Sequence, residues 1–206
     1  MTALDWPACQ NARDLGGLPT VDGQVLRAAV LYRSDGLFRL SPAGVAAVRA
    51  AELARIIDLR WQREVERDPS PFAGDAIYRH VPMLEDVLTY RVWHDTYGPM
   101  LDHNQSRIAD AFRALAAAPP GGPVVVHCDG GRDRTGVLVA LALAIAGVPA
   151  AEIVSDYARS PERPPIAMTN TLAYLAERYG GAEPYLLSIG VTAGEIASVR
   201  RRLTTA

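Results

Sequence analysis

Residues 123–147, PVVVHCDGGRDRTGVLVALALAIAG, decide the fold. The apolar run at residues 124–126 is typical of a strand buried on both faces, and the Ala/Leu/Val run from Val137 onward is typical of a buried helix. A polar, glycine-rich loop joins the two. A strand that continues through such a loop into a helix directs several backbone N–H groups toward one point, beside the positive end of the helix dipole. The stretch therefore predicts an anion-binding loop.

The side chains of this loop fit one kind of chemistry. Cys128 and Arg134 enclose five residues, the spacing Cys-x5-Arg. A cysteine just before a helix N-terminus and near arginines is favoured as the thiolate, which is nucleophilic without a general base. Arg134 can bind two phosphoryl oxygens at once, and Gly130 and Gly131 let the backbone curve around an anion. Thr135 can donate a hydrogen bond to the sulfur. Together these residue types indicate nucleophilic attack on phosphorus.

An isolated Cys-x5-Arg spacing also occurs by chance, in strand–loop–helix units whose cysteine is a small buried hydrophobe. The sequence context argues against that alternative, because two glycines, a preceding histidine and a following Thr-Gly all fit a phosphate-binding loop. We expect His127 to make a buried hydrogen bond that shapes the loop and not to transfer a proton.

The decapeptide HCDGGRDRTG, residues 127–136, resembles the HCxxGxxR[ST]G signature of cysteine-dependent protein tyrosine phosphatases. Its second half is similar to the HCxAGKDRTG loop of bacterial atypical tyrosine and dual-specificity phosphatases. The CxxGxDRT pattern also resembles that of myotubularin-type phosphoinositide phosphatases. The sequence departs from the bacterial pattern with Asp129 at a variable site, Gly130 in place of Ala and Arg132 in place of Lys. An Arg keeps the charge of a Lys but not its shape.

Other segments extend the resemblance over most of the chain. Residues 11–35, NARDLGGLPTVDGQVLRAAVLYRSD, are similar to the family's NxRDxGGxxTxDGxxxRxGxLYRSD stretch. Residues 56–60, IIDLR, and 151–160, AEIVSDYARS, also match family patterns. Two interpretations of Arg13 and Asp14 remain open, since they can reach the phosphate loop or belong to a structural Arg–Asp pair.

The resemblance implies a two-step hydrolysis of phosphomonoesters. The Cys128 thiolate attacks phosphorus and forms a phosphocysteine, while Arg134 and the loop amides hold the equatorial oxygens. An acid protonates the leaving oxygen, and the same group then acts as a base on water. Two carboxyl groups are candidates for this acid, Asp133 inside the loop and Asp86 just past the third inner strand. A third interpretation is that Asp133 only orients Arg134 or Arg132.

The phosphate group itself is assigned to the loop. The residues expected to bind it are Asp129, Gly130, Gly131, Arg132, Asp133 and Arg134. No metal or other cofactor is required, because Arg134 and the amides supply the positive potential, and phosphate and vanadate are expected to inhibit. The implied substrate is phosphotyrosine in proteins, with dual specificity for phosphoserine and phosphothreonine. The alternatives are a phosphoinositide phosphatase and a non-catalytic phospho-residue-binding module.

The resemblance and the apolar pattern imply an α/β fold with a central, mostly parallel sheet flanked by helices, as in tyrosine phosphatases, and with an N-terminal hairpin, a helical lid and C-terminal helices. We expect one phosphatase domain over residues 1–206. The turn signal Asp22-Gly23 favours a hairpin between residues 18–21 and 24–33. Further strands are expected at residues 54–59 and 76–81. Helices are expected at residues 42–52, 105–118, 150–160, 169–179 and 192–203.

A long insertion follows the strand at residues 76–81. Residues 83–104 form a candidate lid, because long loops of this kind often cover active sites. Two interpretations of its aromatic residues Tyr90, Trp93 and Tyr97 stay open: they can cover an aryl phosphate or pack as one face of an amphipathic helix.

Composition excludes several other classes of function. The net charge is −2 and all 21 basic residues are Arg, so no bulk positive field indicates nucleic acid or an anionic membrane surface as partner. The histidines lack metal-ligand spacing. Residues 137–151 are too few for an integral membrane segment, and residues 1–14 do not have the pattern of a signal peptide. With Cys9 and Cys128 alone there is no disulfide framework, so we expect a cytoplasmic protein, with export without a signal left open.

Overall fold

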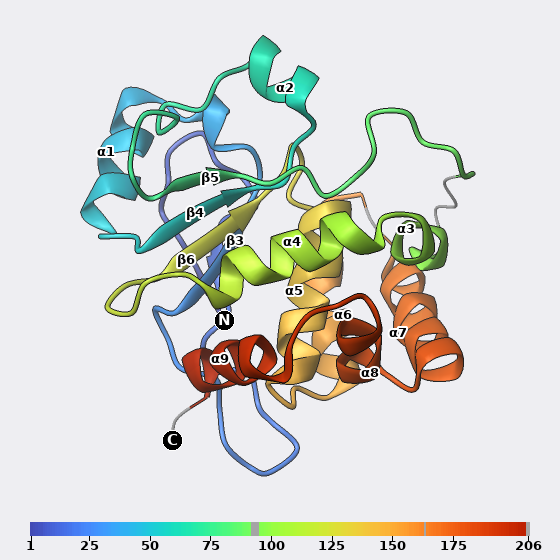
Figure 1. The fold of residues 1–206 in the computed structure, drawn as a ribbon. Coiled ribbons are helices and arrows are strands. Elements are labelled where there is room, and N and C mark those ends of the chain that lie inside the picture. The colour runs from blue at the N-terminus through green and yellow to red at the C-terminus, as the bar shows by residue number, and fades with distance from the viewer. Residues whose placement is uncertain (92–94, 163, 205–206) are drawn as a thin grey trace.

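The computed structural model builds the chain around one mixed sheet and describes every residue except 92–94, 163 and 205–206. The described strands lie in the order β1-β2-β3-β6-β4-β5 (Figure 1). Their bounds are β1 Thr2–Ala3, β2 Arg13–Asp14, β3 Leu31–Ser34, β4 Arg55–Asp58, β5 Tyr78–His80 and β6 Val124–His127. Strands β3, β6, β4 and β5 pair in parallel, whereas β1, β2 and β3 pair antiparallel. The predicted α/β fold with a mostly parallel sheet is confirmed.

Helices flank the sheet, with α1 on one side and the longer helices on the other (Figure 1). The described helices are α1 Pro42–Ala50, α2 Gln62–Arg67, α3 Gly98–His103, α4 Gln105–Ala116, α5 Asp133–Ile145, α6 Ala150–Ala158, α7 Pro165–Tyr179, α8 Ala182–Ser188 and α9 Ala193–Leu203. A short 3-10 turn, Leu37–Arg39, precedes α1. Each helix expected above is present. The structure also has the short helices α2, α3 within the candidate lid, and α8, which is too short to give a clear periodic pattern. None of the described helices has the length and apolar character needed to cross a bilayer.

The central strand β6 shows why the sheet is covered on both faces. Side chains alternate along a strand, so Val124 and Val126 face one side and Val125 faces the other. Val124 and Val126 pack into the large core beneath α4, α5 and the C-terminal helices. Val125 joins Trp6 and Phe72 in a second cluster on the α1 face. An all-valine strand therefore suits this position, because both of its faces are buried.

The segment before β3 differs in detail from the predicted hairpin. The turn at Asp22-Gly23 is present, closed by a hydrogen bond from the Thr20 N–H to the Gln24 carbonyl at 2.9 Å. Only Pro19 and Val25 form a bridge, however, and β3 begins at Leu31 and pairs with β2 and β6 instead. Leu18, Thr20 and Leu26 are buried, whereas Val21 and Val25 are 78% and 54% exposed, so the residues nearest the turn have no apolar contact that would extend the strands. Pro19 also lacks an N–H group for a ladder hydrogen bond.

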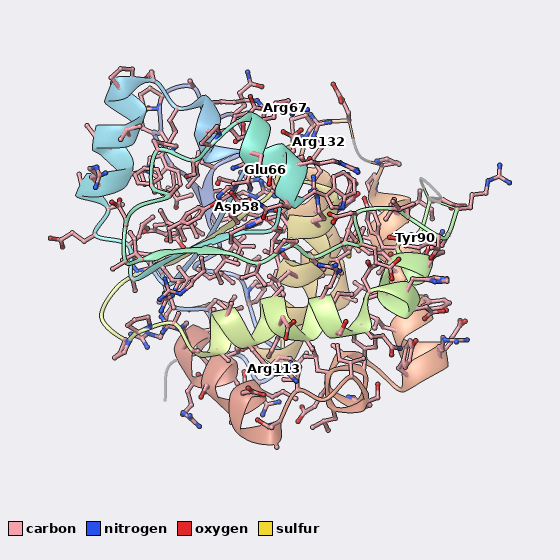
Figure 2. All side chains as sticks on the ribbon, turned by 45° about the horizontal axis from the view of Figure 1, so that its top comes forward. Asp58, Glu66, Arg67, Tyr90, Arg113 and Arg132 are labelled. Carbon is pink, nitrogen blue, oxygen red and sulfur yellow. The ribbon has the colours of Figure 1, made fainter. Side chains whose placement is uncertain are left out.

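The parallel strands direct three connecting segments toward one edge of the sheet. Strand β4 leads into α2, β5 leads into the candidate lid, and β6 leads into the Cys128 loop and α5. The carboxyl ends of parallel strands are where ligands bind in open α/β sheets. Figure 2 turns this end of the molecule forward and labels Arg132, which directly precedes α5, and Glu66 and Arg67 on α2.

Candidate active site

The loop that contains Cys128 begins where β6 ends and runs to the first residue of α5. Cys128 is almost completely buried, with 2% of its surface exposed, and it contributes to the wall of a cavity. Gly131 has φ +66°, and a Cβ atom there would lie 2.3 Å from the Ser34 carbonyl oxygen. Only glycine fits this position without a shift of the backbone, because the left-handed conformation and the close approach both exclude a side chain.

Two side chains fix the direction of the peptide groups in the loop. Asn11 donates from Nδ2 to the carbonyl oxygens of Gly130 at 3.2 Å and Gly131 at 3.1 Å. Arg33 donates from Nη2 to the Gly131 oxygen at 2.7 Å. In a trans peptide the N–H points opposite to the carbonyl, so the N–H groups of Gly131 and Arg132 face away from Asn11 and Arg33. Converging N–H groups of this kind form an anion-binding concavity.

A buried ion-pair network supports the loop from below. Asp156 accepts from Arg13 Nε at 2.7 Å and from Arg33 Nη1 at 2.6 Å. Burial favours a neutral Asp156, but the two guanidiniums outweigh it and lower the pKa of Asp156. Of the two interpretations of Arg13, the structure shows the structural ion pair, with Asp156 as its partner. The Asp14 carboxylate instead accepts from the Gly16 and Ala29 N–H groups.

Arg134 is held in place by a carboxylate on α2. Its Nη1 and Nη2 donate to Glu64 Oε2 at 2.5 Å and Oε1 at 3.0 Å, a bidentate pair. The guanidinium also lies 4.6 Å from the centroid of the Trp61 ring. Burial opposes the charge of Arg134, but the nearby Cys128 and Glu64 outweigh it and raise the pKa of Arg134. The guanidinium is therefore oriented and fully charged next to Cys128.

Two cavities meet at the loop. The first, about 360 Å³, is polar, and its lining includes Cys128, Arg132, Arg134, Arg39 and Asn11. The second, about 340 Å³, is mainly apolar, and its lining includes Trp61, Leu84, Leu88, Tyr90, Tyr97 and Met100. Asp129, Asp133 and Arg134 line both cavities. The candidate nucleophile thus lies in a charged cavity whose neighbour can receive an apolar group.

The two candidate acids occupy different environments. Asp133 lines both cavities and accepts a hydrogen bond from the Tyr97 hydroxyl. Asp86 is exposed, its carbonyl oxygen accepts from Arg63 Nη1 at 2.7 Å, and it is not among the described residues that line the two cavities. The structure therefore brings Asp133 together with Cys128 and leaves Asp86 outside.

The remaining predicted site residues surround the loop. Asp129 pairs with Arg39 at 2.9 Å, and Arg132 pairs with Glu162 at 2.5 Å, both at the exposed rim. Thr135 is buried, and its hydroxyl has no hydrogen-bond partner in the part of the chain that the structure describes. An unpaired buried donor is costly, so this hydroxyl fits a partner that arises during reaction. Its predicted bond to the sulfur stays a prediction.

His127 and the IIDLR strand have the structural roles expected of them. His127 Nδ1 lies 3.2 Å from the Cys128 carbonyl oxygen, and burial lowers the pKa of His127, which favours the neutral ring. The fully buried pair Arg60–Asp58 has an N–O distance of 2.7 Å. These residues shape the loop from β4 and β6 and do not enter the cavities.

The structure favours one of the two interpretations of the aromatic residues in the candidate lid. Tyr90 and Tyr97 line the apolar cavity, whereas Trp93 lies outside the described residues. Helix α3 is the only helix described within residues 83–104. The described aromatic side chains of this segment therefore face the site and do not form one face of a continuous helix.

Three residues that hold the loop had no assigned role in the sequence analysis, namely Glu64, Asn11 and Arg33. Glu64 carried a usable signal, because an acidic residue in the first turn of a helix directly after β4 must lie at the carboxyl edge of the sheet. Its Oε2 accepts from the Trp61 N–H at 2.6 Å, which fixes the carboxylate at the helix start. Asn11 and Arg33 act across long sequence separations that a single sequence does not encode visibly.

Comparison with known proteins finds tyrosine phosphatases among the relatives of this chain. The tyrosine phosphatase family, as a sequence profile, matches residues 4–168. A tyrosine-protein phosphatase of Nostoc commune is 30% identical over 229 residues, which cover 90% of this chain and 78% of that protein. The triple specificity protein phosphatase PtpB of Mycobacterium tuberculosis is 29% identical over 216 residues, covering 87% of this chain and 76% of PtpB. The solved structure of P. aeruginosa TpbA in complex with pTyr has a TM-score of 0.47 and 16% identity, covering 80% of this chain and 88% of TpbA. The chain therefore belongs to the tyrosine phosphatase family, and it is a phosphatase.

Proposed function

We propose that this protein hydrolyses phosphotyrosine in proteins through a phosphocysteine intermediate on Cys128. One observation carries the proposal: Cys128 and the Arg134 guanidinium, which Glu64 holds by two hydrogen bonds, line the same polar cavity, directly beside an apolar one. The polar cavity suits a phosphoryl group, and the apolar cavity suits the aryl ring that carries it.

In the first step the Cys128 sulfur forms a bond to phosphorus as the bond from phosphorus to the leaving oxygen breaks. The electron pair of that bond stays on the leaving oxygen, which takes a proton from Asp133. Arg134 and the N–H groups of Gly131 and Arg132 bind the equatorial oxygens, whose charge is matched by donors already in place.

In the second step water replaces the sulfur at phosphorus. Asp133, now a carboxylate, takes a proton from the water, and the thiolate of Cys128 leaves. The Thr135 hydroxyl donates to this sulfur and stabilises its negative charge, which gives the buried hydroxyl the partner it otherwise lacks. The products are inorganic phosphate and the starting form of the enzyme.

Phosphotyrosine is favoured as substrate by the lining of the apolar cavity. Trp61, Tyr90 and Met100 offer contacts to a planar ring, and its volume of about 340 Å³ lies within the usual range for ligand pockets, roughly 300–1,000 Å³. Phosphoserine and phosphothreonine would leave much of that surface uncovered. We therefore propose phosphotyrosine as the preferred residue, with slower dual-specificity action on the other two.

A second candidate activity is the hydrolysis of phosphoinositides. It is favoured by Arg39 and Arg132, which line the polar cavity beside Arg134 and can bind a second phosphate group. Both arginines are paired with carboxylates at the rim, Asp129 and Glu162, so a second phosphate must compete for them.

Turnover of p-nitrophenyl phosphate in EDTA tests the reaction class. We expect metal-independent hydrolysis that vanadate inhibits and that Cys128→Ser abolishes. Binding of phosphotyrosine without turnover would make the protein a phospho-residue-binding module and would overturn the proposal. A panel of phosphopeptides and inositol lipids then ranks the substrates, and faster hydrolysis of the lipids would replace phosphotyrosine by the second candidate.

We further propose that the protein acts in the cytoplasm. The reaction depends on a reduced thiol at Cys128, and both Cys9 and Cys128 are free in the structure. A reducing compartment keeps such thiols active. Fractionation of cells followed by immunodetection tests this location, and recovery outside the cell would contradict it.

A further inference from the structure

A chain of hydroxyl groups leads from the protein interior to the candidate acid. The Tyr97 hydroxyl donates to Asp133 Oδ1, and the Tyr157 hydroxyl lies 2.6 Å from the Tyr97 hydroxyl. Tyr97 precedes α3 in the candidate lid, Asp133 begins α5, and Tyr157 lies on α6. Three separate segments thus converge on one carboxyl group.

Both tyrosines are fixed by their surroundings. Tyr157 is 1% exposed and packs against Gly136, where a Cβ atom would lie 3.0 Å from the tyrosine ring. Tyr97 is 6% exposed, and its backbone N–H donates to Thr171 Oγ1 at 2.8 Å. The two rings pack edge to face, with centroids 6.1 Å apart. The hydroxyl of Tyr97 therefore has one position, at Asp133.

The hydrogens of this chain can be assigned. A tyrosine hydroxyl has one hydrogen to donate. Tyr97 uses its hydrogen on Asp133, so Tyr157 donates to Tyr97. Burial, together with Asp133, raises the pKa of Tyr97, so its hydroxyl keeps the proton and remains a donor. The direction of donation thus runs from Tyr157 through Tyr97 to Asp133.

We propose that Tyr97 is a positioning residue for the general acid, and that Tyr157 supports it. This inference rests on the proposed role of Asp133 as the acid. A neutral carboxyl group carries its proton on one oxygen. Because Oδ1 already accepts from Tyr97, the proton that goes to the leaving oxygen is carried on Oδ2. Tyr97 thereby fixes both the orientation of the carboxyl group and the oxygen that holds the proton.

Loss of the positioning by Tyr97 should slow the hydrolysis of substrates whose leaving group must be protonated more than that of substrates whose leaving group departs without a proton. Phenyl phosphate has a poor leaving group that needs an acid, whereas p-nitrophenyl phosphate has a good one that needs it much less. The measured quantity is the ratio of kcat/KM for phenyl phosphate to kcat/KM for p-nitrophenyl phosphate. For Asp133→Asn we expect this ratio to fall about 100-fold or more. For Tyr97→Phe we expect a fall of about 10-fold, and for Tyr157→Phe about threefold.

A matched control separates this role from general loss of a buried hydroxyl. Tyr174 donates to Asp102 Oδ2 at 2.6 Å, and neither is among the described residues that line the two cavities, so Tyr174→Phe also removes a Tyr–Asp hydrogen bond. We expect it to leave the ratio unchanged. The double variant Tyr97→Phe/Asp133→Asn is expected to match Asp133→Asn alone, because Tyr97 acts through Asp133.

The outcomes distinguish the two proposals. If Asp133→Asn leaves the ratio unchanged, the acid assignment fails, and this inference fails with it. If Asp133→Asn lowers the ratio but Tyr97→Phe and Tyr157→Phe lower kcat/KM equally for both substrates, only the positioning role of Tyr97 is overturned. Melting temperatures of all variants show whether Tyr97→Phe is folded, and should it not be, the ratio for Tyr157→Phe decides: a fall supports the role and no change overturns it.

Discussion

Ion pairs between arginine and a carboxylate hold the Cys128 loop on two sides, one buried beneath the loop and one exposed at its outer edge, the rim. On the underside, the side chains of Arg33 and Asp156 are each 1% exposed. At the rim, Arg132 is 25% exposed and its partner Glu162 is 75% exposed. Buried pairs are expensive to break because a charge is left without water or partner, whereas exposed pairs contribute about 0–1 kcal/mol. The buried pairs therefore fix the shape of the loop, whereas the exposed pair at the rim can be broken at little cost in stability.

The pair between Arg134 and Glu64 lies between these extremes, with side chains 10% and 12% exposed. Glu64 lines the apolar cavity and Arg134 lines both cavities, so the pair faces the site and not the buried network beneath the loop. Breaking it is therefore expected to change catalysis more than stability. The three pairs form a series in which burial sets the cost in stability, and the series can be tested one pair at a time.

The largest loss of stability is expected from Asp156→Asn. The amide cannot neutralise Arg13 and Arg33, so we expect unfolding free energy to fall by about 3–5 kcal/mol. Urea denaturation measures this loss. A cost below about 1 kcal/mol would mean that the buried network does not support the loop.

The same carboxylate predicts how stability depends on pH. The folded state lowers the pKa of Asp156, so its contribution is present above the unfolded value of about 3.9 and is lost as pH falls below it. We expect the stability of the wild type to fall more steeply on acidification than that of Asp156→Asn. Equal slopes in the two proteins would show that Asp156 does not contribute to the pH dependence of stability.

Gly131→Ala is expected to cost about 2–4 kcal/mol and most of the activity, because the new Cβ meets the Ser34 carbonyl at 2.3 Å and the left-handed backbone disfavours alanine. Gly23→Ala is the matched control, since Gly23 has φ +81° with nothing within 4 Å of the added atom. It carries only the backbone cost. Equal effects of the two substitutions on melting temperature and kcat/KM would show that the close approach in the loop is unimportant.

For Glu64→Gln we expect a loss of about 1–2 kcal/mol in stability and about a 10-fold fall in kcat/KM, since Arg134 loses a charge-assisted bidentate partner. Glu66→Gln on the same helix is the control, because its carboxylate accepts only an exposed bond from Gln62 among the contacts described. Vanadate affinity should fall with kcat/KM in the first variant alone. An unchanged kcat/KM would show that catalysis does not depend on the pairing of Arg134 with Glu64.

The smallest effect is expected at the rim. Glu162→Gln removes the charge that pairs with Arg132, and we expect a change of at most about 1 kcal/mol in unfolding free energy. Activity toward p-nitrophenyl phosphate should change less than twofold. A loss as large as that of Asp156→Asn would erase the difference between the two sides of the loop.

The sequence predicted the parts of the site that depend on local order. Cys128, Gly131 and Arg134 follow from the strand–loop–helix pattern, and the parallel sheet follows from its apolar strands. The resemblance added Asp133 but could not choose between it and Asp86, because the position of a lid depends on packing. In the structure, Tyr97 of the candidate lid donates a hydrogen bond to Asp133.

The residues that the sequence did not assign act over long separations. Arg33 contacts a loop that is 98 positions away, and Asn11 contacts it across 120 positions. No local period or turn signal marks such contacts. The hairpin strands at residues 18–33 were predicted too long, because Val21 and Val25 have β propensity but lie exposed beside the turn.

The proposed reaction requires that Cys128 receives the phosphoryl group. Rapid denaturing quench of the enzyme during turnover of p-nitrophenyl phosphate, followed by mass spectrometry of its peptides, tests this directly. We expect one phosphoryl group on the peptide that contains Cys128 and none in Cys128→Ser. Turnover with no phosphorylated peptide, or with the group on another residue, would contradict it.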